Sequence, residues 1–130
     1  MNDKIIKEKI LELEQEALEQ WSEGNVRGYL LHAADDITYM DDIGAQNRIE
    51  GIKPLQDYAL KLEGQIPKHN YEVVNPKVQV YGESAILSMK YHPFSPEGNS
   101  LTQWKATTVY RLSGGKWKMV HAHWSMNKEA

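Results

Sequence analysis

The sequence contains no cysteine, only one phenylalanine, and no long apolar run. A chain without cysteine cannot form a disulfide framework, a thiolate zinc or iron–sulfur site, or a cysteine nucleophile. No segment approaches the roughly 20 apolar residues of a membrane span, and the N-terminal segment carries charges every few residues, unlike a signal peptide. We therefore expect a cytoplasmic protein that does not bind or cross a membrane.

A strong basic excess is also missing, because the formal net charge is −3. Domains that bind nucleic acid usually carry a basic patch, and no glycine-rich loop is placed to hold a phosphate. We expect no nucleic-acid partner and no cofactor. The charge is unevenly spread: residues 1–65 hold 7 basic and 14 acidic side chains, whereas residues 66–130 hold 8 and 4. This division predicts two layers of different character.

The 130 residues are enough for one domain with its own core, which we place at 1–130. Apolar residues recur every three or four positions in three segments of the first half. The first begins with Asp3 as its cap and ends near Gly24, the second is short and begins at Asn25, and the third follows Gly51. Between the second and third segments, residues 37–40 favour an edge strand.

The second half of the chain has the pattern of strands separated by turns. Candidate strands span 69–81 (interrupted at Asn75–Pro76), 84–92, 101–112 and 116–125. Helices followed by meandering strands predict an α+β domain, with about three N-terminal helices packed on one face of a curved, mostly antiparallel sheet. Which face of strand 84–92 points inward stays open at this stage.

The dipeptide Gly114–Gly115 predicts a two-residue hairpin turn, and this turn fixes a register for the last two strands. With regular alternation, the face expected under the helices gathers Trp104, Ala106, Thr108, Tyr110, Leu112, Trp117, Met119, His121 and His123. Trp124 then falls on the opposite, more basic face. A large aromatic side chain on that face favours a homodimer.

The element order and the closing segment 115–125 (GKWKMVHAHWS) resemble the nuclear transport factor two-like superfamily, in its SnoaL-like branch. The resemblance is stronger to the association (hub) domain of calcium/calmodulin-dependent protein kinase II and its free-standing bacterial relatives. Segments 47–51, 74–80 and 107–110 support it. It implies a cone-shaped, cystatin-like roll with a pocket between helices and sheet, assembled into dimers or larger rings.

The chain departs from the hub domain in the pocket. Thr108 stands where the hub carries an arginine, the arginine near Ser100 is absent, and Lys105–Ala106 replace an acidic pair. These differences remove the basis for an anion-binding pocket of the hub kind. No kinase or calmodulin-binding segment is present, so kinase activity is not implied.

Two histidines are the first candidates for chemistry. In the regular register His121 and His123 lie two residues apart on the helix side, where they could bind a ligand or act as acid and base with Asp36 or Tyr39. The alternative is a structural role in a polar core. We expect no metal site, because only two ligands can be named with confidence. The four aspartates at 35, 36, 41 and 42 fit caps and turns, although Asp36 could also be a general acid.

Aromatic side chains are expected to border the pocket, because buried tyrosine and tryptophan need polar partners. The predicted ligand-binding residues are Tyr29, Tyr39, Tyr58, Trp104, Thr108, Tyr110, His121 and His123. We expect a homo-oligomeric protein that binds a small organic molecule. An acid–base isomerase or hydratase and a bare oligomerisation module are the alternatives.

Overall fold

The computed structural model describes residues 2–127. It contains two α-helices, a short 3₁₀ helix (η1) and six strands. In chain order these are α1 Asp3–Ser22, η1 Arg27–Leu30, β1 Ala33–Met40, β2 Ile49–Glu50, α2 Ile52–Leu62, β3 Asn70–Tyr81, β4 Ser84–Phe94, β5 Trp104–Ser113 and β6 Lys116–Met126.

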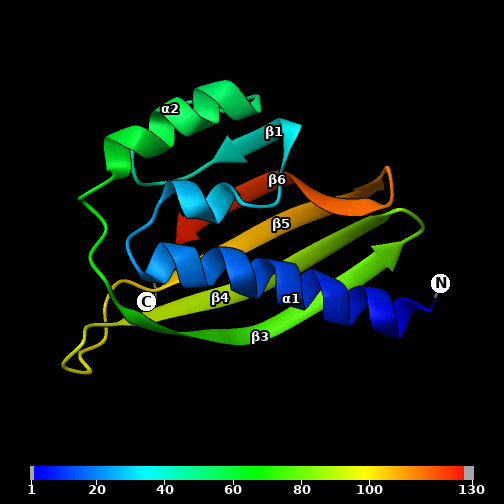
Figure 1. The fold of residues 1–130 in the computed structure, drawn as a ribbon. Helices are drawn as coiled ribbons and strands as arrows, with labels where there is room; N and C mark the ends of the chain where they lie inside the picture. Colours follow the sequence, from blue (N-terminus) through cyan, green and yellow to red (C-terminus); the bar gives the residue numbers. More distant parts are fainter. Residues whose placement is uncertain (1, 128–130) are drawn as a thin grey trace.

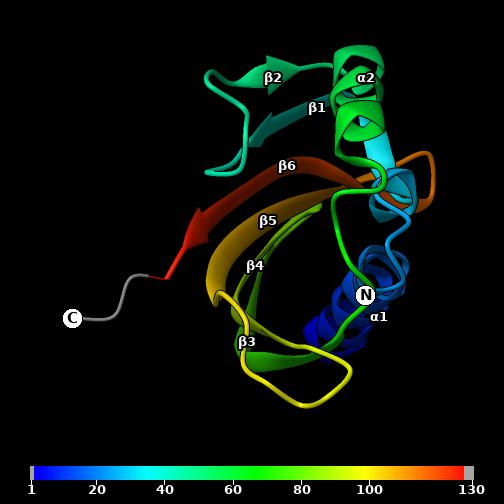
Figure 2. The ribbon, with the colours of Figure 1, turned by 90° about the vertical axis from the view of Figure 1, so that its left-hand side faces the viewer.

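The strands form one curved sheet in the order β2-β1-β6-β5-β4-β3. Strands β1 and β6 are parallel, and all other neighbours are antiparallel. Figures 1 and 2 show α1 lying across the concave side of the sheet, with α2 above β1. The expected α+β roll is confirmed. No helix in the described part of the chain is both long and apolar enough to span a membrane.

Three local expectations need correction. The second predicted helix is a single 3₁₀ turn, and the chain has already entered β1 at Ala33. Residues 37–40 belong to β1, which is not at the edge of the sheet, because the two-residue strand β2 pairs with its outer side. The cap of α1 is Asn2 instead of Asp3, since the Asn2 side chain accepts a hydrogen bond from the Lys4 N–H at 2.7 Å.

Strand β4 crosses the centre of the four-stranded antiparallel part of the sheet. Its alternate residues Ala85, Leu87, Met89 and Tyr91 are buried, so these side chains form its inward face. The neighbouring β3 is bulged between Val74 and Lys77, at the predicted interruption, and Asn75 has a positive φ of 50°. The core therefore lies between α1 and the concave face of β3–β6.

The last hairpin begins as predicted and then changes face. Gly114 and Gly115 have φ values of 58° and 78°, as a primed turn requires. Tyr110 pairs with Met119, but Val109 pairs with His121, so Val120 has no partner on β5. This extra residue is a β-bulge, which reverses the side-chain alternation along the rest of β6.

The bulge overturns the expected faces of the last strand. Ala122 and Trp124 are buried on the helix side, whereas His121 is half-buried and His123 is exposed on the convex side. Thr108 faces Ala122 instead of His121, and Ala106 faces Trp124 instead of His123. Trp124 is therefore not the exposed side chain from which a homodimer was expected, and that prediction of its position was wrong.

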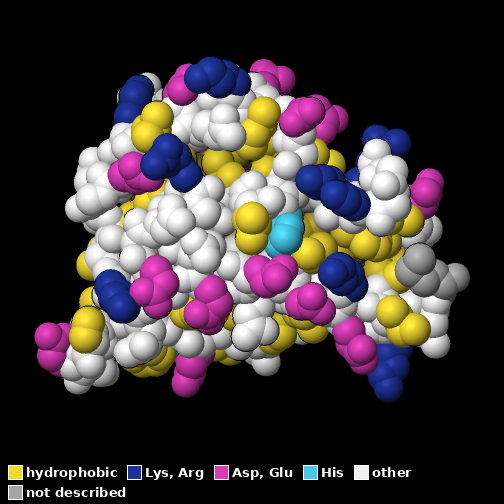
Figure 3. Space-filling view, in the orientation of Figure 1, with side chains coloured by type: hydrophobic (Ala, Val, Ile, Leu, Met, Phe, Trp, Pro, Cys, Tyr) yellow, Lys and Arg dark blue, Asp and Glu magenta, His cyan; other side chains and the backbone are white. Residues whose placement is uncertain are grey.

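The two faces of the molecule differ in charge, as the uneven composition predicted. Figure 3 views the helix side, where acidic side chains form a row over α1. The exposed acidic residues of this helix include Glu8, Glu12, Glu16 and Glu19. The convex face of the sheet is basic instead, with exposed Lys77, Lys90, Lys105 and Arg111.

Truncating Trp124 tests the inward rotation of β6. If the side chain fills the core, Trp124→Ala removes a large buried group and is expected to lower the free energy of unfolding by about 3–5 kcal/mol, measured by urea denaturation. Tyr81→Ala is the control, because Tyr81 is 62% exposed, and its effect should stay within about 0.5 kcal/mol. A small effect at Trp124 would contradict the rotated strand.

Candidate functional site

A cavity opens between the C-terminal end of α1, η1 and the concave face of the sheet. All its lining side chains are aromatic or aliphatic, and they come from seven different segments: Trp21, Tyr29, Tyr39, Ile43, Tyr91, Trp104 and Trp124. Lining of this kind is typical of pockets for small molecules.

The predicted ligand-binding residues divide into three groups. Tyr29, Tyr39 and Trp104 line the cavity. Tyr58, Thr108 and Tyr110 lie outside its lining, but each donates a hydrogen bond to a carboxylate that a wall tyrosine also contacts. The predictions at His121 and His123 fail in position, because the bulge turns both side chains to the convex face.

A buried carboxylate lies beneath the cavity. Glu14 of α1 is 2% exposed. Its Oε1 accepts hydrogen bonds from Tyr110 at 2.7 Å and Thr108 at 3.0 Å. Its Oε2 accepts one from the Tyr29 hydroxyl at 3.2 Å. The Trp124 indole N–H in turn donates to the Tyr29 oxygen at 3.1 Å. Glu14 thus joins α1 to η1, β5 and β6 through one polar network.

Burial raises the pKa of Glu14 above its ordinary value, and the hydrogen bonds from Tyr110, Thr108 and Tyr29 offset only part of this effect. Glu14 was not among the residues predicted from the sequence. The signal was present, because Glu14 lies four positions after Ile10 and three before Ala17, on the apolar stripe of α1. A carboxylate in that stripe points into the core.

A second carboxylate holds the loop at the cavity mouth. Asp41 Oδ1 accepts backbone N–H bonds from Ile43, Gly44 and Ala45 at 3.0, 3.2 and 3.0 Å. Its Oδ2 accepts the hydroxyls of Tyr39 and Tyr58 at 2.8 and 2.7 Å. These bonds position Ile43 beside the cavity.

Burial acts to raise the pKa of Asp41, but the hydrogen bonds outweigh it and the pKa is lowered. The carboxylate is therefore ionised at neutral pH. From the sequence, Asp41 is expected mainly to fill a turn. The three backbone bonds fit that assignment, but the contacts with Tyr39 and Tyr58 depend on tertiary packing.

Tyr91 is the residue of β4 that lines the cavity. Its hydroxyl lies 2.6 Å from His69 Nε2, and His69 Nδ1 lies 2.8 Å from the Pro67 carbonyl oxygen. A carbonyl can only accept, so Nδ1 donates to it, and in the neutral ring Nε2 accepts the Tyr91 proton. Tyr71 stacks on Tyr91 with ring centroids 5.1 Å apart.

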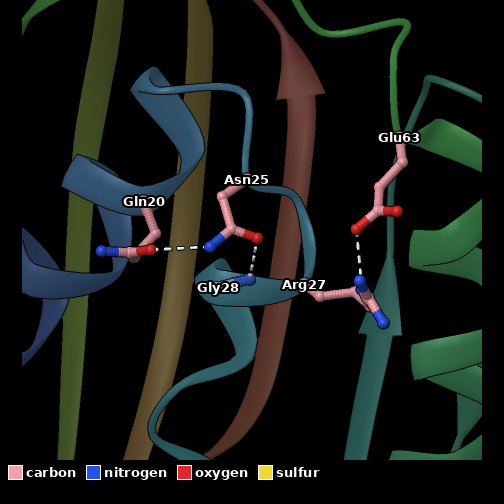
Figure 4. Close-up of polar contacts among 5 residues, drawn as sticks. All are labelled: Gln20, Asn25, Arg27, Gly28 and Glu63. Atoms are coloured by element: carbon pink, nitrogen blue, oxygen red, sulfur yellow. Dashed lines mark hydrogen bonds and ion pairs between the residues drawn. The ribbon is translucent and has the colours of Figure 1, made fainter.

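The turn that carries Tyr29 is fixed from both sides (Figure 4). The Asn25 side chain accepts the Gly28 N–H at 3.1 Å and donates to Gln20 Oε1 at 2.8 Å. A Cβ on Gly28 would lie 2.6 Å from the Cβ of Gln20, so this close approach requires glycine. Arg27 Nε binds Glu63 Oε1 at 2.7 Å and joins η1 to the end of α2.

The three catalytic candidates do not meet in the cavity. Asp36 is exposed. His121 Nδ1 lies 2.8 Å from the Thr38 hydroxyl on the convex face. Burial, and then the neighbouring His123, lower the pKa of His121, and the bond with Thr38 opposes this. Within residues 2–127, no three His, Asp or Glu side chains are grouped to hold a metal ion.

Replacing Glu14 tests the state of the buried carboxylate. The raised pKa means that folding favours the protonated form, so this stabilisation is fully present below the ordinary value of 4.5 and is lost as the pH rises through the raised pKa. Glu14→Gln removes the titration. We expect the unfolding free energy of the wild type, relative to this variant, to fall as the pH rises from 4.5 in urea denaturation.

The exposed Glu8 of the same helix offers a control. Glu8→Gln should change stability by less than about 0.5 kcal/mol. A difference between wild type and Glu14→Gln that does not change with pH would contradict the raised pKa.

Comparisons with known proteins add to this geometry. The model of the calcium/calmodulin dependent protein kinase II association domain family matches residues 6–128. A search of curated proteins found no match.

Several solved structures share the fold at low sequence identity. An NTF2-like protein of unknown function from Pseudomonas putida is 21% identical, with a TM-score of 0.85 over 97% of this chain and 89% of that one. The association domain of the kinase from C. elegans is 24% identical, with a TM-score of 0.76 over 95% and 99%. A protein of unknown function with a cystatin-like fold from Nostoc punctiforme is 18% identical, with a TM-score of 0.79 over 95% and 92%.

These structures support the fold, and the family match spans almost the whole chain, including the residues that build the cavity. The protein belongs to the calcium/calmodulin dependent protein kinase II association domain family.

Proposed function

We propose that this protein is a self-associating domain that binds a small organic molecule in the aromatic cavity. The observation that carries the ligand part is that the walls of this open cavity are apolar throughout. Pockets for small molecules are lined mainly by hydrophobic and aromatic side chains. No charged side chain is among the lining residues.

The geometry favours binding over acid–base catalysis. An isomerase or hydratase needs a proton-transfer group within hydrogen-bond reach of the substrate. His121, His123 and Asp36 do not line the cavity. The carboxylates of Glu14 and Asp41 are each covered by a tyrosine hydroxyl. The arrangement offers apolar contact at the surface of the cavity and fixed polar groups behind it.

Blocking the cavity tests ligand binding. We expect a thermal-shift screen of small, partly aromatic compounds to raise the melting temperature, because a ligand that binds only the folded state stabilises it. Ile43→Trp places a larger side chain at the mouth, where Ile43 is 38% exposed, and should abolish the shift.

Met40→Trp is the matched control. Met40 is 37% exposed and follows the inward-pointing Tyr39 on β1, so the added ring lies away from the cavity. The shift should persist in this variant. Compounds that stabilise both variants equally would count against the cavity as the binding site, and a screen without any shift would count against ligand binding.

Family membership supports self-association, since solved relatives are described as an association domain and a hub. Both helices cover the concave side, which leaves the convex face of the sheet bare (Figure 2). An uncharged row crosses the middle of that face from strand to strand: Thr38, His121, Val109, Ile86 and Gln79. Interface centres are depleted in charge and have polar rims. We place the contact with a second copy on this row.

A charge at the centre of the row tests the proposed contact. Val109→Glu should convert the assembly to monomers in analytical ultracentrifugation, because a buried, unpaired carboxylate is costly at an interface. Val109 is only half-buried in the single chain, so the variant should still fold.

Leu60→Glu introduces the same charge at an exposed position of α2 and should leave the assembly intact. Dissociation by Leu60→Glu instead of Val109→Glu would move the contact to the helix side. A wild-type protein that sediments as a monomer would contradict self-association itself. Native mass spectrometry of the same samples weighs the assembly together with any retained molecule.

A further inference from the structure

The cavity walls are formed by aromatic rings that meet at steep angles. Trp21 and Tyr29 have ring centroids 6.1 Å apart and an interplanar angle of 70°. For Tyr29 and Trp124 the values are 5.9 Å and 75°. For Tyr91 and Trp124 they are 5.5 Å and 84°. Rings that meet nearly at right angles form the corners of a box, and the electron-rich faces of such rings attract cations.

The wall tyrosines have no hydroxyl proton left for a ligand. Tyr29 donates to Glu14, Tyr39 donates to Asp41, and the hydroxyl of Tyr91 donates to the ring of His69. The indole N–H of Trp124 is also used, because it donates to Tyr29. What these tyrosine hydroxyls still offer is oxygen lone pairs. A ligand that meets them favourably must bring hydrogen-bond donors or positive charge.

Negative charge stands behind the box, and no cationic side chain lines it. The ionised carboxylate of Asp41 lies one hydrogen bond, 2.8 Å, behind the hydroxyl of Tyr39. Glu14 lies 3.2 Å behind the hydroxyl of Tyr29, but its raised pKa favours the neutral form, so the negative charge comes from Asp41. Asp41 is only 8% exposed, and the field of a buried carboxylate acts more strongly than it would in solution. An anion would meet this field unfavourably, and a cation would be stabilised by it.

The indoles of Trp21 and Trp104 are the remaining polar groups of the lining. Within residues 2–127 neither indole N–H has a hydrogen-bond partner in the structure, so these two groups could also serve an acceptor on a ligand. An experiment on charge preference should therefore also include an anionic compound.

We infer that the cavity selects a small organic cation, of the protonated or quaternary amine class, held by the aromatic walls. The inference rests on the proposed function, since it names the ligand class of the same cavity. The positive group would lie among the ring faces, and any attached hydroxyl or N–H would meet the tyrosine oxygens.

Three compounds of nearly the same shape can separate the contribution of charge to binding from that of apolar contact. Choline carries a quaternary ammonium, 3,3-dimethylbutan-1-ol replaces the nitrogen by carbon, and 3,3-dimethylbutanoate is an anion. Isothermal titration of the full chain with each compound should give choline a dissociation constant at least about 10-fold lower than that of the alcohol, as expected for a desolvated cation–π site.

Each other outcome overturns the inference. If the alcohol binds as tightly as choline, the cavity binds small molecules by apolar contact, so the proposed function stands and the charge preference falls. If the butanoate binds most tightly, the selected ligand is an anion. If none of the three compounds binds, the cation site is disproved, and the screen with the Ile43→Trp variant decides separately on the proposed function.

Replacing one aromatic residue of the lining tests whether choline binds in the cavity. Trp104 is only half-buried, so Trp104→Leu should fold, and we expect it to weaken choline binding about 5- to 30-fold while changing the affinity for the alcohol much less. Tyr81→Leu, at an exposed aromatic outside the cavity, is the control and should leave choline binding unchanged. Equal losses for choline and the alcohol in Trp104→Leu would overturn the role of the aromatic wall.

Discussion

The β-bulge at Val120 is the constraint on which the rest of the site depends. One unpaired residue in β6 reverses the side-chain alternation of the strand beyond it. Trp124 therefore points to the concave face, where its indole N–H reaches the Tyr29 hydroxyl. Without that rotation the cavity would lose a wall, and the polar chain that leads from Trp124 through Tyr29 to Glu14 would lack its first member.

The site combines an apolar surface with polar groups one layer behind it. Glu14 and Asp41 do not line the cavity. They accept hydrogen bonds from the hydroxyls of Tyr29 and Tyr39, and these bonds hold the two rings in place. A buried carboxylate is costly unless several donors satisfy it, and both carboxylates meet that condition. The hydrogen bonds that stabilise the carboxylates also hold the rings of the cavity walls, so stability and the shape of the site rest on the same contacts.

The two faces of the sheet serve separate parts of the proposed function. The concave face holds the core and the cavity, while the convex face is bare and carries an uncharged row across its centre (Figure 2). Because strand residues alternate between faces, one sheet can present an apolar pocket on one side and a contact surface on the other. A ligand and a second copy would then not compete for the same side chains.

The sequence by itself determined the α+β class, the limits of most strands, the glycine hairpin turn and the aromatic character of the pocket. These features follow from local periodicity and turn chemistry, which act within a few residues. The tertiary structure alone decided the direction of His121, His123 and Trp124, because a bulge is a property of two paired strands. It also decided the roles of Glu14 and Asp41, because their donors Tyr110 and Tyr58 lie 96 and 17 residues away along the chain. Local patterns carry no information about contacts over such separations, which arise only when α1 and the loop after β1 pack against the completed sheet and α2.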